Sequence, residues 1–287
     1  MIRMIGAAAL FAVMAIFVGA AHERDPSLSM FAASAWRSAI NLIMLIIVVK
    51  GNFQLLFGDR RPALWARGVL GAGSLFTYFA AIALLSAGEA AFLNQTSAVW
   101  VAVLAPWVLG EKTPRMVWFA IAGSLIGMAL LVHPREVDGD GLGRFIGLAS
   151  GMFAAGAYLS IRAAGRSNPP EAIVFWFTII GVPLGVFATW ATGGQWPRDP
   201  IVILHLFGAG ISATFAQLLM TQAYRSTRAG VVAAASAAGP LFTTALGAIF
   251  LGQIPDPRSR LGMAILAICA ILLPLLAERQ STESSTA

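Results

Sequence analysis

The stretch Arg3-Met4-Ile5-Gly6 returns later in the chain as Arg144-Phe145-Ile146-Gly147, and Leu109-Gly110-Glu111 returns as Leu251-Gly252-Gln253. Between these two matches, Gly71-Ala72-Gly73 returns as Gly208-Ala209-Gly210, and Trp36 has its counterpart in Trp176. All four pairs are about 140 residues apart and follow the same order, which is the signature of a duplicated structural unit. Chance similarity between helices rich in alanine and glycine is the alternative. The repeat therefore predicts a chain of two homologous halves.

The composition points to lipid as the solvent of this protein. Of 287 residues, 58% are hydrophobic and only 11% are charged, whereas soluble domains average about 25% charged residues. So few charges do not cover a water-facing surface. The net charge of +6 does not indicate a nucleic-acid partner, because the basic residues fall in short connectors between apolar runs. We therefore expect membrane lipid, and no nucleic acid, as the surroundings of the chain.

Hydrophobic runs give the number of membrane crossings. A bilayer core about 30 Å thick requires about 20 apolar residues per helix, and proline, asparagine and aspartate punctuate the connectors between such runs. The first run also fits a cleaved signal peptide ending in Gly19-Ala20-Ala21, but the repeat requires it as a helix. We predict an all-α polytopic membrane protein with ten transmembrane helices, at residues 4–21, 29–49, 64–86, 89–109, 114–132, 143–163, 171–192, 201–224, 229–251 and 259–277.

The distribution of lysine and arginine orients these helices. With the N-terminus inside, twelve basic residues, Arg67 among them, fall on the cytoplasmic side and six fall outside, while Arg37 lies within a helix. Cytoplasmic loops carry an excess of Lys and Arg. We therefore expect both termini in the cytoplasm and a multi-pass protein of a bacterial inner membrane.

An odd number of helices per unit has a geometric consequence. A copied unit of five helices enters the membrane from the opposite side, so the halves, residues 1–138 and 139–277, are predicted to be inverted repeats. Residues 278–287 are predicted to form a disordered cytoplasmic tail. Inverted repeats place a binding site near the bilayer midplane between the halves and open it alternately to each side. The sequence thus predicts a central cavity.

The segment Leu84-Leu85-Ser86-Ala87-Gly88-Glu89-Ala90-Ala91, followed by a helix ending in Leu109-Gly110-Glu111-Lys112-Thr113, resembles the EamA repeat of the drug/metabolite transporter superfamily. The stretch from Arg228-Ala229-Gly230 through Gly239-Pro240 to Leu251-Gly252-Gln253 is similar to the same motif. The two copies differ, since Ala98 stands where the second has Pro240, and Gln253 stands where the first has Glu111. The similarity covers nearly the whole chain and is greatest to the aromatic amino-acid exporters of the superfamily.

The resemblance implies ten helices around a central cavity lined mainly by the first, third, fourth, sixth, eighth and ninth. It also implies export of a small metabolite by alternating access. We rank neutral and aromatic amino acids first, because only Arg37 is available as a deep cation and the helices carry aromatic side chains. Drugs or other metabolites of broad specificity, or a non-transport scaffold role, are the alternatives. We expect a monomer or weak dimer.

Polar side chains within hydrocarbon are costly and mark functional sites by default, although helix packing also uses small hydroxyl residues. Tyr78 and Gln217 lie on narrow polar stripes of the third and eighth helices. Intramembrane aromatic residues suit an apolar ligand group. The predicted substrate-binding residues are Met14, Phe17, Tyr78, Asn94, Trp100, Tyr158, Gln217 and Ser236; the predicted gating or outer-mouth residues are Trp36, Arg37, Trp176 and Pro240.

Other chemistry finds no support in the sequence. HExxH, GxSxG and P-loop motifs are absent, and every aspartate falls in a connector. The single cysteine, Cys269, lies within an apolar run. We therefore expect no enzyme activity, no metal and no cofactor. Because the helices carry no acid pair of the kind that relays protons, we hypothesise a facilitator or loosely coupled transport.

Overall fold

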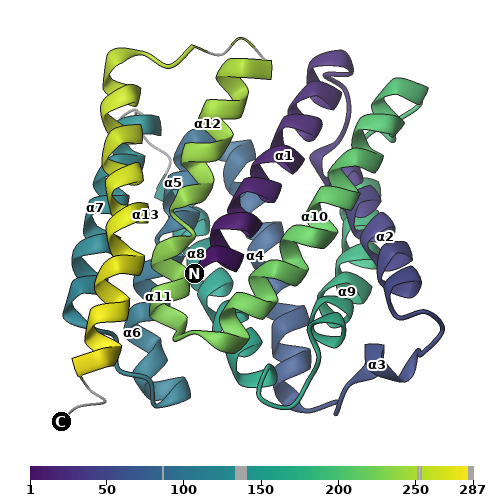
Figure 1. Cartoon of the computed structure of the whole chain (residues 1–287). Coiled ribbons are helices and arrows are strands. Elements are labelled where there is room, and N and C mark those ends of the chain that lie inside the picture. Colours follow the sequence, from purple (N-terminus) through teal and green to yellow (C-terminus); the bar gives the residue numbers. More distant parts are fainter. Residues whose placement is uncertain (86, 133–140, 251, 253, 284–287) are drawn as a thin grey trace.

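A computed structural model of the whole chain describes residues 1–85, 87–132, 141–250, 252 and 254–283. The described residues form a layer of upright helices that is more than one helix deep, with α1, α10 and α12 in front of α4, α5 and α8 (Figure 1). The helical segments are α1 (Ile2–Arg24), α2 (Met30–Val48), α3 (Gln54–Phe57), α4 (Pro62–Leu84), α5 (Ala87–Gln95), α6 (Ser97–Leu109), α7 (Arg115–Val132), α8 (Gly141–Ala164), α9 (Pro170–Ala191), α10 (Pro200–Ser226), α11 (Ala229–Ala235), α12 (Ala238–Phe250) and α13 (Pro257–Glu283).

The ten predicted helical ranges are each occupied by helix. Within the described residues, seven helices are long and apolar enough to cross a membrane, and a shorter apolar helix spans Arg115–Leu131. The short α3, which the sequence did not predict, lies in the connector after α2. α13 ends at Glu283 rather than at residue 277, so it continues into the predicted disordered tail. Residues 284–287 of that tail lie outside the described residues.

The connectors end helices for reasons that are visible in the sequence. The first turns of α4, α9 and α10 contain Pro62, Pro170 and Pro200. A backbone N–H at this position has no acceptor within the helix, so proline, which lacks the N–H, costs no hydrogen bond there. Asp199 caps α10, since its carboxylate accepts a hydrogen bond from the backbone N–H of Ile201 at 2.8 Å. Ser29 caps α2 in the same way through the N–H of Phe31 at 3.2 Å. These local signals set the helix starts.

Two predicted helices are interrupted, and they occupy matching places in the two halves. The range 89–109 is divided at Thr96 into α5 and α6, and the range 229–251 is divided at Ser236 and Ala237 into α11 and α12. The Thr96 hydroxyl donates a hydrogen bond to the carbonyl of Leu93 at 2.6 Å, and the Ser236 hydroxyl donates to the carbonyl of Ala233 at 2.6 Å. Each side chain thus satisfies backbone that the interruption releases.

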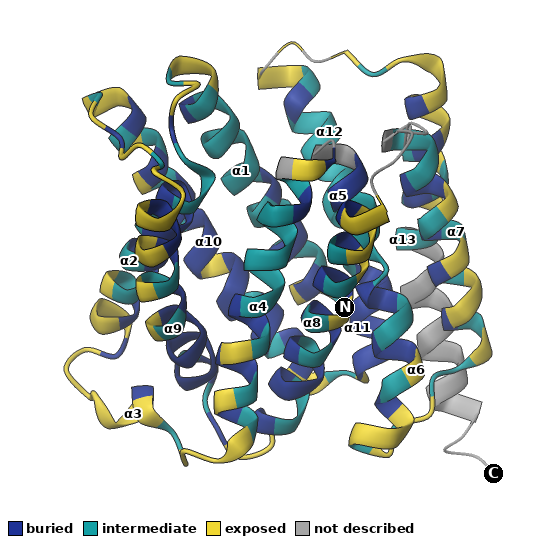
Figure 2. Ribbon diagram, turned by 180° about the vertical axis from the view of Figure 1, so that it is seen from behind, coloured by how far each residue is buried: buried dark blue, intermediate teal, exposed yellow. Residues whose placement is uncertain are grey.

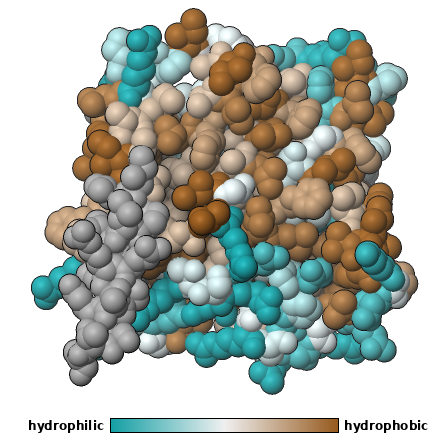
Figure 3. All heavy atoms as spheres, in the orientation of Figure 1, coloured by the Kyte–Doolittle hydropathy of each residue, from teal (hydrophilic) through white to brown (hydrophobic). Residues whose placement is uncertain are grey.

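Burial and hydropathy follow the pattern of a membrane protein. Buried residues gather on the helix faces that meet within the layer, and exposed residues concentrate at its rims and outward faces (Figure 2). Large apolar side chains on the outward faces stay exposed, for example Phe119 at 72% and Phe145 at 70%. Apolar residues cover the face shown in Figure 3, and hydrophilic residues gather along its lower edge. An apolar surface of this extent requires hydrocarbon around it.

Helix contacts between the halves come in corresponding sets. α4 packs on α8 and α1 packs on α10; α2 packs on α10 and α4 packs on α9. α2 also packs on α9, and α7 packs on α13. In Figure 1, α1 rises through the layer while α8 descends, and α4 rises while α10 descends. The central helices of one half are therefore buried against the other half.

A polar cluster joins the connectors of the two halves at the lower side. The Asn168 side chain, 1% exposed, accepts a hydrogen bond from the backbone N–H of Asp59 at 2.8 Å and donates one to its carboxylate at 2.9 Å. The Ser167 hydroxyl donates to the same carboxylate at 2.6 Å. This Ser167 hydrogen bond makes the largest contribution to holding the pKa of Asp59 below its usual value. The stabilisation is present at neutral pH and is lost as the pH falls through the lowered pKa.

We expect the Asn168→Ala variant to lower the free energy of unfolding by about 0.5 to 1.5 kcal/mol, because the buried amide loses its hydrogen bonds to the backbone N–H and the carboxylate of Asp59. Thermal unfolding in detergent measures this change. Asn52→Ala is the matched control, since Asn52 is exposed in the connector after α2 and its variant should unfold at the wild-type temperature. Equal melting temperatures for the two variants would show that the cluster does not join the connectors.

Candidate functional site

A hollow lies at the centre of the helix layer, where the two halves meet. It consists of two adjoining cavities of about 310 and 500 Å³. Both are lined by α1, α4, α5, α8 and α10; the smaller is also lined by α2 and α9, and the larger by α6, α7 and α12. The two cavities share the side chains of Phe11, Tyr78, Asn94, Tyr158 and Met220. A volume of this size suits a small organic ligand.

Arg67 of α4 enters the smaller cavity as a buried cation. The residue is 3% exposed. Its Nη2 donates a hydrogen bond to Oε1 of Gln217 on α10 at 3.2 Å, and its guanidinium carbon lies 4.2 Å from the ring centroid of Phe177 on α9. Gly71, one turn along α4, makes room for this arrangement, because a Cβ there would meet Nη1 of Arg67. The cavity wall is thus built around the guanidinium.

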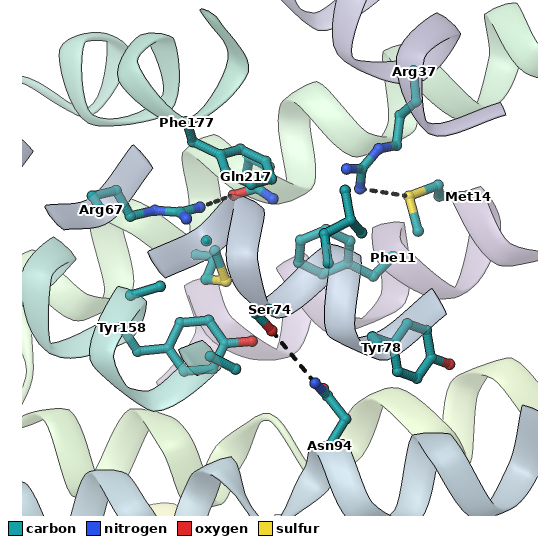
Figure 4. A pocket seen from close by; sticks show the side chains of 15 residues that line it. Phe11, Met14, Arg37, Arg67, Ser74, Tyr78, Asn94, Tyr158, Phe177 and Gln217 are labelled. Carbon is teal, nitrogen blue, oxygen red and sulfur yellow. Dashed lines mark hydrogen bonds between the residues drawn. The ribbon is translucent and has the colours of Figure 1, made fainter. Parts of the chain in front are cut away.

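Arg37 of α2 reaches the same cavity from the opposite side. Its guanidinium carbon lies 5.9 Å from the centroid of the same Phe177 ring, and its Nη1 lies 3.9 Å from the sulfur of Met14. Figure 4 shows Arg37 and Arg67 approaching from opposite sides, with their guanidinium ends directed toward the space beside Gln217. Because both groups lie near one ring, they are within the length of a small molecule of each other.

The two arginines lack a compensating negative charge. Among the described residues that line the two cavities, none is aspartate or glutamate, and neither arginine forms an ion pair with a described residue. Nε of Arg67 and Nη2 of Arg37 are buried without a hydrogen-bond partner in the described part of the chain. An arginine at membrane depth costs about 2.5 to 3.5 kcal/mol, and each contact with a ring recovers about 0.5 to 2 kcal/mol. The cavity is therefore strongly electropositive.

Hydroxyl and amide groups form the opposite wall. The Ser74 hydroxyl donates to the carbonyl of Ser150 at 3.0 Å, and Nδ2 of Asn94 donates to the Ser150 hydroxyl at 3.0 Å and to Ser74 at 3.5 Å. Next to them the ring of Tyr158 stacks on that of Tyr224 with centroids 5.3 Å apart. The wall therefore offers polar groups at one position and an aromatic face at another.

Eight of the twelve sequence-predicted site residues line the hollow. The smaller cavity is lined by Met14, Arg37 and Gln217, and the larger by Ser236 and Pro240. Both cavities are lined by Tyr78, Asn94 and Tyr158. These eight residues are Met14, Arg37, Tyr78, Asn94, Tyr158, Gln217, Ser236 and Pro240. They come from seven different helical segments and from the junction between α11 and α12, which the fold brings together.

The other four lie elsewhere. Phe17 packs against His205, with ring centroids 6.3 Å apart. Trp100 packs against the buried core, and Trp36 packs against a separate apolar cluster near the end of α1. Trp176 packs against Trp65 with ring centroids 4.3 Å apart and ring planes tilted by 51°, and its indole N–H donates to the carbonyl of Phe57 at 3.1 Å. The structure does not bring these aromatic side chains to the cavity.

Pro240 lies in the first turn of α12. Because proline has no N–H, it cannot bond the carbonyl of Ser236 four residues earlier. That carbonyl instead accepts a hydrogen bond from the N–H of Gly239 at 2.9 Å, so the backbone already occupies it.

Sequence reasoning missed Arg67, which it assigned to the cytoplasmic boundary; that assignment was wrong, because the side chain is buried in the cavity wall. The signal was present, since Arg67 precedes Gly71, Ser74 and Tyr78 on one face of α4 by helical spacing. Phe177 was missed as well, although it is the repeat counterpart of Arg37. Phe11 and Met220 look like ordinary apolar helix residues, so the sequence gives no reason to single them out.

A second polar cluster joins the two halves at the lower side. Oε1 of Glu111, at the end of α6, accepts a hydrogen bond from Nε of Arg162 at 2.7 Å, and Oε2 accepts one from the backbone N–H of Ala229 at 3.0 Å. Arg162 also donates to the carbonyls of Tyr224 and Arg225 at 3.2 and 2.5 Å. One first-half carboxylate thus holds three second-half helices, α8, α10 and α11.

We expect the Gly71→Ala variant to lower the free energy of unfolding by about 1 to 3 kcal/mol, because the added methyl group displaces Arg67 and meets Phe177 Cδ2 at 2.8 Å. Gly73→Ala is the control in the same helix. A Cβ at Gly73 comes no closer than 3.7 Å to Phe153, so the gain in helix propensity should leave its melting temperature unchanged or raised. If the two variants unfold alike in detergent, the close packing around Arg67 is not as described.

Comparison with known proteins agrees with this architecture. A solved crystal structure superposes with a TM-score of 0.82 over 97% of both chains at 20% sequence identity, which shows a shared fold. A pseudopaline exporter of Pseudomonas aeruginosa is 29% identical over 92% of this chain and 94% of its own length. The human solute carrier family 35 member G1 is 23% identical over 86% of this chain and 70% of its own.

The family comparison covers both halves of the chain. The model of the EamA-like transporter family matches residues 1–133 and again residues 141–275, so the duplicated unit is that family's repeat and the two matches divide the chain near the predicted boundary at residue 138. The matched relatives are transporters, and neither the matches nor the cavity indicates an enzyme. The chain is a multi-pass membrane protein and belongs to the EamA-like transporter family.

Proposed function

We propose that the protein exports a small organic metabolite by alternating access, with the central cavity as its substrate site. The observation that carries the proposal is the hollow itself, which is lined by both halves and contains polar and charged groups that hydrocarbon would not tolerate without a function. Cavities between repeats are where transporters bind their substrates.

The mechanism rests on two inverted halves, and several features support the inversion. The contact of α4 with α8 corresponds to that of α1 with α10, as expected when one half is related to the other by a two-fold axis. Corresponding helices run in opposite directions through the layer in Figure 1. Arg37 and Phe177, which occupy the same place in the two repeats, lie against each other. An axis in the membrane plane accounts for all three features.

Rocking of the halves around the hollow would then expose it to each side in turn. In this structure Glu111 accepts hydrogen bonds from Arg162 and from the backbone of Ala229 and so joins the two halves at the lower side. In the orientation given by the basic residues, this side is the cytoplasm. The outward-facing step leaves this group intact, and the inward-facing step requires the carboxylate to release both partners.

Two substrate classes have specific support. Neutral and aromatic amino acids fit the aromatic side chains of the hollow, among them Phe11, Tyr78 and Tyr158. The similarity to a pseudopaline exporter supports an exported metabolite of a different kind. The ground for ranking neutral amino acids first has weakened, because Arg67 joins Arg37 as a deep cation.

Inversion predicts that corresponding connectors of the two halves lie on opposite sides of the membrane. We expect a membrane-impermeant maleimide to label the Ser27→Cys variant from outside intact cells and the Ser167→Cys variant only after permeabilisation. Cys269→Ala supplies the background, because Cys269 is the only cysteine in the sequence. The two serines are exposed in the α1–α2 and α8–α9 connectors. Labelling of both from the same side would contradict the inverted arrangement.

Transport is measured in proteoliposomes with a panel of labelled amino acids and organic acids. We expect the Gln217→Ala variant to transport roughly tenfold more slowly than the wild type, because Arg67 and the substrate lose a hydrogen-bonding partner. Gln222→Ala is the control from the same helix, since Gln222 does not line the hollow. Equal rates for the two variants would remove Gln217 from the substrate path.

The same proteoliposomes address proton coupling. The cavity lining described above contains no carboxylic acid that could carry a proton with the substrate, so transport should proceed without a pH gradient. A strict requirement for the gradient would contradict the facilitator hypothesis and leave the alternating-access mechanism unaffected.

A further inference from the structure

We propose that the central cavity selects an organic dianion, a molecule with two carboxylate groups on a partly apolar skeleton, which Arg37 and Arg67 bind together. The inference rests on the proposed transport function and specifies the substrate class of that site.

The first support is the unused hydrogen-bonding capacity of the two guanidinium groups. Arg67 donates from Nη2 to Gln217, and its buried Nε has no partner among the described residues; Arg37 has only the distant sulfur of Met14, and its buried Nη2 has no partner there. A guanidinium presents donors in a fixed fork that matches a carboxylate. Each arginine therefore has capacity left for one carboxylate.

The second support is the charge of the cavity. Its described lining contains two cations and no acid, so a dianion neutralises the site, whereas a cation adds a third positive charge. A zwitterionic amino acid neutralises only one guanidinium's charge with its carboxylate, and its ammonium group finds no acidic partner. In a water-poor cavity such differences are amplified. Charge complementarity thus favours two carboxylates over one.

The third support is the arrangement of the apolar surfaces. Phe177 lies between the two arginines, at 4.2 Å from Arg67 and 5.9 Å from Arg37, and Phe11 and Leu75 extend the apolar wall. The carbon skeleton that joins two carboxylates can lie against these side chains while its ends reach the guanidinium groups. In Figure 4 the labelled aromatic side chains surround the space toward which the two arginines point.

Gln217 completes the clamp from the second half. Its Oε1 accepts the hydrogen bond from Arg67 and thereby holds that guanidinium in the cavity, and the side chain is 6% exposed. Arg37 and Arg67 come from α2 and α4, whereas Gln217 and Phe177 come from α10 and α9. Relative movement of the halves therefore changes the distance between the cations and their supports, which links binding to the conformational step.

A series of ligands that share a phenyl group and differ in charge tests the inference on the purified full chain in detergent. Phenylsuccinate carries two carboxylates, 3-phenylpropionate one, phenylalanine a carboxylate and an ammonium, and phenethylamine only an ammonium. At saturation we expect phenylsuccinate to raise the melting temperature by roughly 3 °C or more. We also expect it to bind about tenfold more tightly than 3-phenylpropionate or phenylalanine, and phenethylamine not to bind.

The variants Arg37→Gln and Arg67→Gln should each remove the advantage of phenylsuccinate over 3-phenylpropionate, and Arg67→Lys should restore part of it. Arg198→Gln is the control, because Arg198 is exposed in a connector, and its ligand series should match that of the wild type. The wild-type series decides the matter even if a variant fails to fold. Equal or tighter binding of phenylalanine, or no shift with phenylsuccinate, overturns the inference.

Transport separates this inference from the function on which it rests. Proteoliposomes that move phenylalanine without preferring phenylsuccinate would overturn the dianion clamp and leave the transport proposal standing. Proteoliposomes that move no member of the amino-acid and organic-acid panel would overturn the transport proposal itself.

Discussion

Hydrocarbon solvates neither peptide groups nor charges, and this constraint governs the whole molecule. It requires each backbone polar group to find a partner within its own segment, which is why the chain consists of helices joined by short connectors. At the two interruptions, the hydroxyl groups of Thr96 and Ser236 donate hydrogen bonds to backbone carbonyls that the interrupted helix no longer pairs in the regular way. The same constraint makes Arg37 and Arg67 informative, since two cations within the helix bundle are costly and mark a functional site.

The two halves share one order of helices but contribute different side chains to the hollow. The first half supplies both arginines, Tyr78 and Asn94, and the second supplies Phe177, Gln217 and Tyr158. The polar contact between the halves at the lower side is also asymmetric. The first half contributes the carboxylate of Glu111, and the second contributes its donors, Arg162 and the backbone N–H of Ala229. Duplication thus provides the frame, and divergence between the copies provides the binding site.

Much of the fold could be predicted because its signals are local. Runs of apolar residues and the prolines at helix starts locate all ten helical ranges, and the two family matches cover residues 1–133 and 141–275, on either side of the boundary that the repeat predicts. Most of the predicted site residues were polar or aromatic side chains within helices, and six such residues line the hollow together with Met14 and Pro240.

The remainder depends on contacts between distant segments, which spacing does not reveal. Arg67 looks like a boundary residue when basic residues are only counted along the chain; its burial follows from Gly71 beside it and Phe177 across from it. Trp36 and Trp176 are equivalent in sequence, yet only the Trp176 indole N–H donates a hydrogen bond to the carbonyl of Phe57. Phe57 lies in α3, a helix that the hydrophobic pattern does not predict.

The contact of Arg37 with Phe177 constrains how such a cavity can arise. α2 and α9 touch each other, and these two residues hold equivalent positions in them. An ancestral pair of identical five-helix subunits, associated in the same way, would have placed the same side chain at both positions: two arginines repelling each other, or two phenylalanines without a cation. A ring beside a guanidinium at that junction therefore requires two copies that have mutated independently.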